Sequence, residues 1–145
     1  MFIKKKFVTS LILYFIFFSF SLAKENYYDE AKKNFDKKEL EVSKFLFQKN
    51  IVFNPKDVKS YLYLAKIFNL EGNEKEEEKN LDTTLLLDPA NEEAMYMLIK
   101  IKLKKSNYST VQDLKEKFAI ICVNLCEKTK EINNTLKNIE PKNDT

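Results

Sequence analysis

Two cysteines are the side chains of this chain best suited to chemistry. Cys122 and Cys126 are its only cysteines, and they form a C-x3-C pair. Across four helical residues the Cα atoms lie about 6 Å apart, a separation that a disulfide can bridge. Two other interpretations stay open at this point: a dithiol that carries electrons or copper, and a pair of buried, reduced thiols.

Composition excludes most other catalytic and metal sites. The chain has no histidine, so it can build neither a triad with a histidine base nor a zinc site with imidazole ligands. Its single glycine cannot form a glycine-rich phosphate loop. Paired carboxylates such as Glu92 and Glu93 are typical of a first helical turn, where the helix dipole favours acidic side chains. We therefore predict that the protein is not an enzyme and uses no cofactor or metal.

The first 23 residues have the pattern of a secretory signal peptide. Lysines at 4–6 form a charged start, residues 7–20 are almost wholly apolar, and Ser21 and Ala23 are small residues at the places that a signal peptidase inspects. We predict cleavage between Ala23 and Lys24. The alternative is an uncleaved membrane anchor, although the apolar run is slightly shorter than the roughly 20 residues of a spanning helix. Export to an oxidising compartment favours the disulfide.

The formal net charge of +3 comes entirely from the first six residues. From Lys24 onward the chain has 22 lysines and 22 acidic residues, so its net charge is close to zero. It has no arginine, the side chain best suited to bidentate phosphate contacts. We therefore predict no nucleic-acid partner. Abundant lysine and asparagine without arginine is also typical of an AT-rich coding sequence, which suggests a bacterium. Together with the signal-peptide pattern, this predicts the periplasm or cell envelope as the destination.

The stretch 58–91 predicts two helices joined by a turn. The apolar stripe of the first helix consists of Tyr61, Leu64, Ala65 and Phe68. Gly72 ends this helix, because glycine adopts a left-handed conformation with little strain. Leu81 lies on the stripe of the second helix, and Pro89 ends it, because the residue before a proline is disfavoured in a helix. Neither helix can bury its stripe alone, so each needs the other and a neighbouring pair.

This pattern resembles a tetratricopeptide repeat (TPR), a helical hairpin with a period of 34 residues. The residues that match the repeat are Tyr61, Leu64, Ala65, Phe68, Leu81 and Pro89. Glu77 departs from it, because the family has a small residue there. Pro55 and Pro89 are one period apart, which predicts units at 24–57, 58–91 and 92–125.

The outer units match the repeat more loosely. Departures from the pattern are Glu30, Asn34, Lys102, Lys115 and Val123, the last in place of the proline. We predict an all-α, TPR-like solenoid over 24–139, with an irregular helical bundle as the alternative. A helix over 126–139 would cap the solenoid with its apolar stripe, which includes Ile132 and Leu136. Residues 140–145 are predicted to be a disordered tail, and Ser109 with Gln112 predicts a capping box.

The resemblance also implies a binding surface, because in this family the first helices of the units line a concave groove. The positions in register are Tyr28, Lys32, Phe35, Leu62, Lys66, Asn69, Tyr96, Lys100 and Leu103. Lysines 32, 66 and 100 recur at the period and would suit an extended or helical segment with acidic and apolar groups. Chance alignment in a lysine-rich chain is the other interpretation. The carboxylate clamp of some family members is not supported, because Asn69 is the one asparagine among the nine and arginine is absent.

We therefore predict a non-catalytic protein–protein interaction scaffold or assembly factor whose partner is a protein or peptide segment. One alternative is a scaffold held at a membrane by an uncleaved N-terminal segment. Another is a dithiol redox or copper carrier that acts through Cys122 and Cys126.

Overall fold

A computed structural model describes residues 27–139, and within this range the chain is all-α. The helices are α2 (Tyr27–Asp36), α3 (Leu40–Phe53), α4 (Val58–Leu70), α5 (Glu74–Leu87), α6 (Glu92–Lys104), α7 (Tyr108–Ile121) and α8 (Lys128–Ile139). The predicted signal peptide at 1–23 and the predicted tail at 140–145 lie outside the described residues. None of the helices in the described range has both the length and the apolar character that crossing a membrane requires.

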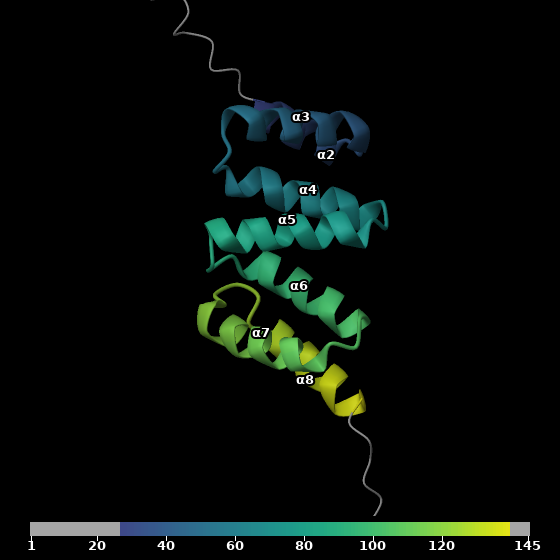
Figure 1. Cartoon of the computed structure of the whole chain (residues 1–145), viewed down its shortest axis with the longest axis vertical. Coiled ribbons are helices and arrows are strands. Elements are labelled where there is room, and N and C mark those ends of the chain that lie inside the picture. The colour runs from purple at the N-terminus through teal and green to yellow at the C-terminus, as the bar shows by residue number, and fades with distance from the viewer. Residues whose placement is uncertain (1–26, 140–145) are drawn as a thin grey trace, which may run out of the picture.

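Three helical hairpins, α2/α3, α4/α5 and α6/α7, lie one after another along the long axis of the molecule, and α8 follows the last of them (Figure 1). The 34-residue period extends through all three. The second helices span 40–53, 74–87 and 108–121, and the complete first helices span 58–70 and 92–104. This regularity confirms the predicted all-α, TPR-like solenoid over the irregular bundle. The last helix begins at Lys128, two residues after the predicted start of the capping helix.

Each hairpin turns through one residue in the left-handed region. These residues are Lys38 (φ 64°), Gly72 (φ 71°) and Ser106 (φ 55°), again one period apart. At the central turn Asn73 N donates to Phe68 O (2.9 Å), the bond that closes a Schellman motif. The Asn73 side chain then caps α5 by accepting from Glu76 N. Asn107 does the same for α7, so the predicted capping box at Ser109 was wrong by two residues.

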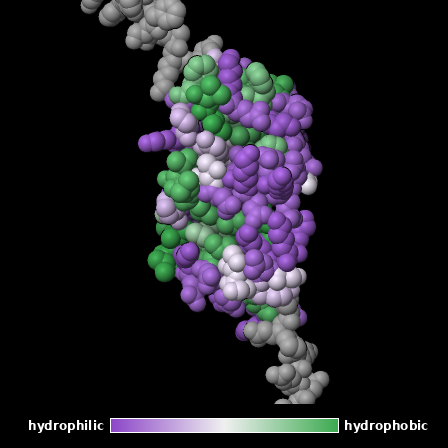
Figure 2. Space-filling view, viewed as in Figure 1, coloured by the Kyte–Doolittle hydropathy of each residue, from purple (hydrophilic) through white to green (hydrophobic). Residues whose placement is uncertain are grey.

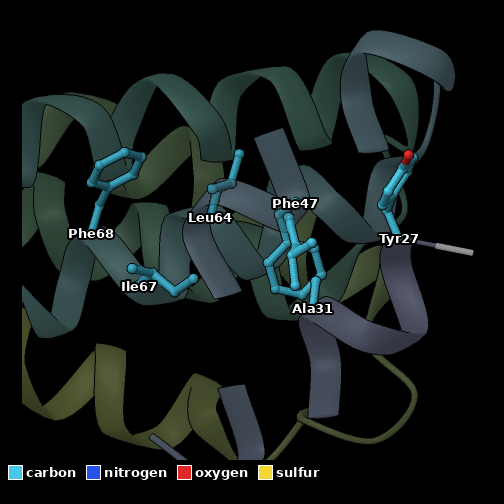
Figure 3. Packing of buried hydrophobic residues seen from close by; sticks show 7 residues of the cluster. Tyr27, Ala31, Phe47, Leu64, Ile67 and Phe68 are labelled. Atoms are coloured by element: carbon cyan, nitrogen blue, oxygen red, sulfur yellow. The ribbon is translucent and has the colours of Figure 1, made fainter. Parts of the chain in front are cut away.

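The core is made between hairpins as much as within them. Figure 3 shows its first cluster, in which α2 and α3 contribute Ala31 and Phe47 and α4 contributes Leu64 and Ile67. The second cluster joins α4 and α5 to α6. In the third, Ile132 and Leu136 of α8 pack against residues of α6 and α7. Each hairpin therefore completes the core of its neighbour.

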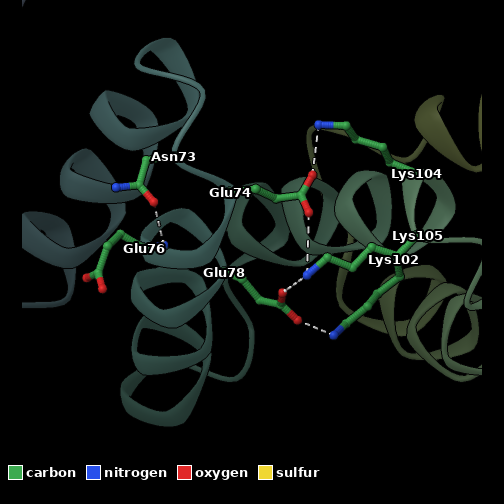
Figure 4. Close-up of polar contacts among 7 residues, drawn as sticks. All are labelled: Asn73, Glu74, Glu76, Glu78, Lys102, Lys104 and Lys105. Carbon is green, nitrogen blue, oxygen red and sulfur yellow. Dashed lines mark hydrogen bonds and ion pairs between the residues drawn. The ribbon is translucent and has the colours of Figure 1, made fainter.

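Ion pairs tie the second unit to the third. Glu74 and Glu78, at the start of α5, face three lysines at the end of α6 (Figure 4). Glu74 lies 2.8 Å from Lys104 Nζ, and Glu78 pairs with Lys102 and Lys105. Lys102 stands where the repeat has an aromatic residue, so an ion pair between units takes the place of an apolar contact. The signs also suit the helix dipoles, with acidic groups at the start of one helix and basic groups at the end of another.

Substitutions at the turn residues test the left-handed backbone conformation of the turns. An alanine Cβ at position 72 would meet no atom within 4 Å, so Gly72→Ala should be unfavourable only through its left-handed φ. We expect it to lower the free energy of unfolding by about 1–2 kcal/mol. Ser106→Gly should raise it by about 0.5–1 kcal/mol, because relief of strain exceeds the entropy that glycine adds to the unfolded chain. Denaturant unfolding of the purified chain measures both changes, and an unchanged midpoint for Gly72→Ala would contradict the turn geometry.

Candidate functional site

A row of tyrosine rings, each with a lysine over it, runs along the first helices of the three hairpins. The rings belong to Tyr28, Tyr63 and Tyr96, and all three are half-buried. The distances from lysine Nζ to ring centroid are 5.9 Å for Lys59 over Tyr28, 4.8 Å for Lys66 over Tyr63 and 5.8 Å for Lys100 over Tyr96. We call these six residues the tyrosine–lysine row. Tyrosine offers a rigid apolar ring with a polar tip, which makes the row suited to contact with another chain.

The predicted groove positions divide into accessible residues and core residues. Five of them are partly accessible around the row: Tyr28, Lys32, Phe35, Lys66 and Tyr96. Asn69 and Lys100 are exposed. Leu62 is only 9% exposed and packs in the second core cluster, so it is not available to a partner. Leu103 packs against the third cluster.

Tyr63 was missed by the sequence prediction. Its ring lies 6.0 Å from that of Tyr28 and 5.1 Å from that of Phe35, so it joins the first unit to the second. In the first and third units the tyrosine stands at the register position of Leu62, whereas in the second unit it stands one residue later. A search for tyrosine within one residue of each groove position would have found it.

The three lysines predicted to form a line differ in their partners. Lys32 Nζ lies 2.8 Å from Asp36 of the same helix, and Lys66 Nζ lies 2.9 Å from Glu93 of the next unit. Lys100 makes no ion pair with a described residue within 4 Å. The line is therefore not a continuous positive stripe, because two of its three charges are already matched.

A carboxylate from the third unit holds the loop that carries the cysteines. Glu92, the first residue of α6, accepts hydrogen bonds from the backbone N–H groups of Val123 (2.7 Å), Asn124 (3.0 Å) and Leu125 (3.1 Å). The side-chain amide of Asn124 also donates to it, at 2.9 Å. Because a proline has no N–H, Val123 in place of the repeat's proline supplies the shortest of these bonds.

The same loop is closed by the cysteines. The structure joins Cys122 and Cys126 in a disulfide, with Cα atoms 5.1 Å apart. The three backbone donors of Glu92 lie between them, so the disulfide and the carboxylate constrain one short loop from two sides. Among residues 27–139 no group of three or more cysteine or acidic side chains is placed to hold a metal ion.

The hydrogen bonds to Glu92 also shift its ionisation. Led by the bond from Val123 N, they lower the pKa of Glu92 to about 2. Sequence reasoning took Glu92 for a simple helix start. Its position in a first helical turn agrees with that interpretation, but its partners lie more than 30 residues away.

The last helix continues the row of first helices. Tyr96 Oη donates to Glu131 of α8 at 2.8 Å, and Lys128 Nζ lies 5.6 Å from the centroid of the same ring. Burial, followed by this hydrogen bond, raises the pKa of Tyr96 to about 12. An ion pair between Lys66 and Glu93 joins α4 to α6. Polar contacts therefore join α4 to α6 and α6 to α8.

The stacked hairpins and the row of first helices define a helical-repeat solenoid. Comparison with solved structures shows which type of helical repeat it resembles. The chain is similar to the type III secretion translocator chaperone SycD of Yersinia enterocolitica, with a TM-score of 0.67 and 14% identity over 79% of this chain and 81% of that one. It is also similar to the first TPR of Spaghetti (RPAP3) bound to an HSP90 peptide, with a TM-score of 0.68 and 12% identity over 77% of this chain and 89% of that one. A third match is the TPR2B domain of yeast Sti1 in complex with pHsp70, with a TM-score of 0.65 and 16% identity over 78% of this chain and 92% of that one.

The chain thus has a TPR-like fold, as its repeat pattern predicted. No protein-family model matches the sequence. No curated protein matches it either.

The loop contact gives a prediction for acid stability. Because the pKa of Glu92 is lower in the folded chain than its ordinary value of 4.5, its contribution is complete above about pH 4.5 and is lost as the pH falls toward 2. Glu92→Gln should therefore lower the free energy of unfolding at pH 6 and have a much smaller effect near pH 2. Urea unfolding at both pH values measures the difference. Glu116→Gln, at an exposed position of α7, is the matched control, and an equal loss at both pH values for Glu92→Gln would contradict the assignment.

Proposed function

We propose that the protein is a non-catalytic interaction scaffold or assembly factor that binds a segment of another protein on the surface of its first helices. The observation that carries this proposal is the tyrosine–lysine row, which presents rigid rings and long cationic side chains along α2, α4 and α6. Half-buried aromatic residues that are held by the fold lose little conformational entropy when a partner binds.

The solved structures with this fold support the class of partner. One SycD structure is a complex with a peptide of the translocator YopD, the RPAP3 domain is bound to an HSP90 peptide, and the Sti1 domain is in complex with pHsp70. By analogy, the occupant of the surface is an extended or helical protein segment. The described residues offer a surface of rings and lysines and no cluster of nucleophile and base, which favours a scaffold over an enzyme.

The proposal places the protein outside the cytoplasm, in the periplasm or cell envelope of a bacterium. It rests on the signal-peptide pattern of residues 1–23 and on the cysteine pair, which an oxidising compartment would keep as a disulfide.

The location is checked by the intact mass of the native protein from soluble and membrane fractions, with and without thiol alkylation. We expect a soluble species that begins at Lys24 and resists alkylation until it is reduced. A full-length species in the membrane fraction, with two reactive thiols, would instead favour the anchored scaffold.

The binding surface is tested with peptides selected from a random display library against the purified chain, with affinity measured by fluorescence anisotropy. Lys66→Glu should weaken binding at least about tenfold, because it reverses a charge at the centre of the row. It also places two carboxylates together, so the double variant Lys66→Glu/Glu93→Lys restores the ion pair and keeps the fold. We expect weak binding from the double variant as well.

Lys117→Glu is the matched control for this experiment, because Lys117 is exposed on α7 and away from the row. It should leave the affinity unchanged. Wild-type affinity in both Lys66 variants would exclude the row as the binding surface. A library that yields no specific peptide would count against the scaffold function itself.

A further inference from the structure

A pocket opens between the second and third units, next to the tyrosine–lysine row. It has a volume of about 320 Å³, and its walls come from α4, α5 and α6. The residues that line it are Asn69, Glu74, Glu77, Met97, Lys100, Ile101 and Lys104. Lys100 belongs to the row, so a segment bound along the first helices would pass the mouth of this pocket.

Glu77 is the unusual residue of the pocket. It is 4% exposed, and its one side-chain hydrogen bond within the described chain is from Asn69 Nδ2 to Oε1, at 3.0 Å. No lysine nitrogen of the described residues lies within 4 Å of it. Every fully buried side-chain oxygen in residues 27–139 has a hydrogen-bond partner, so Oε2, which has none there, must be accessible from the pocket.

A carboxylate in this position lowers the stability of the fold. The TPR pattern has a small residue here, and the removal of a charged group from water is unfavourable unless a counter-charge compensates it. Burial also raises the pKa of Glu77, because it disfavours the charged form of the carboxyl group. A neutral residue of the same shape would pack as well without this cost, so the charge is better explained by a ligand than by folding.

The positive charges of Lys100 and Lys104 offset part of the effect of burial on the pKa of Glu77, but neither lysine forms an ion pair with it. Lys104 Nζ is paired with Glu74 at 2.8 Å, and its side chain is 76% exposed. Lys100 Nζ lies over the ring of Tyr96 instead. Glu74 is already paired with Lys104 and Lys105, so within the described chain Glu77 Oε2 is the carboxylate oxygen of the pocket without a partner, and Met97 and Ile101 add apolar wall.

We propose that this pocket binds a lysine or arginine side chain of the partner segment. The cationic head would donate to Glu77 Oε2 and lie near Glu74, and the methylene stem would pack against Met97 and Ile101. The inference rests on the proposed function, since it assumes a protein segment on the first helices. It adds that the segment carries a basic residue at the point where it crosses from α4 to α6.

The pocket can be tested without knowledge of the partner. The probes are Nα-acetyl-lysine methylamide and its arginine analogue, titrated into the isotope-labelled chain while the Asn69 side-chain amide and the Met97 methyl group are followed by NMR. We expect saturable shifts in the millimolar range. The norleucine analogue, which keeps the stem without the charge, and the glutamate analogue should give none.

Glu77→Gln provides the decisive variant, because it keeps the shape and the hydrogen bond from Asn69 but removes the charge. It should bind the lysine probe at least about tenfold more weakly, with a melting temperature equal to or above that of the wild type. Glu74→Gln, which is nearer the surface, is a second variant that does not alter the core, and it should weaken binding of the probe less.

Glu76→Gln is the control: Glu76 lies on the same helix but does not line the pocket, and Figure 4 shows it turned away from Glu74. Unchanged binding of the lysine probe to both Glu77→Gln and Glu74→Gln, or tighter binding of the glutamate probe, would overturn the proposal.

The library selection separates this inference from the proposed function. Peptides that bind the wild type with a required basic residue, and lose that requirement with Glu77→Gln, would support both. Peptides that bind equally well to both forms would keep the scaffold function and exclude the basic pocket. If no peptide is selected while the lysine probe still binds through Glu77, the pocket stands and the scaffold function fails.

Discussion

The stacking of each helical hairpin on the next is the constraint on which the rest of this structure depends. No hairpin buries its apolar residues alone: Phe47 of the first needs Leu64 and Ile67 of the second, and Leu62 of the second needs Leu98 of the third. Because the apolar contact runs from unit to unit, the first helices must lie side by side, and the row of tyrosines and lysines follows from that arrangement. In the space-filling view, apolar residues gather along the left edge and the upper end of this face, and hydrophilic residues cover most of its right half (Figure 2). The stack ends where α8 covers the third hairpin with a single apolar face.

Three of the departures from the repeat pattern bring polar groups to contacts or sites between different elements of the chain. Lys102 replaces an aromatic residue and pairs with Glu78 of the preceding unit. Val123 replaces a proline and so has the N–H that Glu92 binds. Glu77 replaces a small residue and adds a buried carboxylate to the lining of a pocket. Each of these residues departs from the residue type that the repeat favours. In exchange, each provides a polar contact or a pocket group that the standard repeat residue would not.

The helices were predictable from the sequence because their signals are local. The prolines one period apart and Gly72 mark the turns, and steric preference at these residues holds whatever the neighbours are. The site was less predictable because it depends on rotation and on long-range contacts. Adjacent helical residues point about 100° apart, so the choice between Leu62 and Tyr63 depends on how α4 meets α6. The hydrogen-bond partners of Glu92 lie in the loop between α7 and α8, and no spacing in the sequence indicates them.

The balance of charges on the first helices also limits how a partner can be recognised. Lys66 and Lys32 are already paired, and the chain from Lys24 onward has equal numbers of basic and acidic residues. Long-range attraction of a charged partner is therefore weak, because steering requires an excess of one sign over a wide surface. Under the proposed function, recognition comes instead from short-range contacts that remove water, at the tyrosine rings and at the buried carboxylate of Glu77. Such contacts discriminate by shape and by the position of single hydrogen-bonding groups, so a partner is selected by where its side chains fall along the stack of helices more than by its net charge.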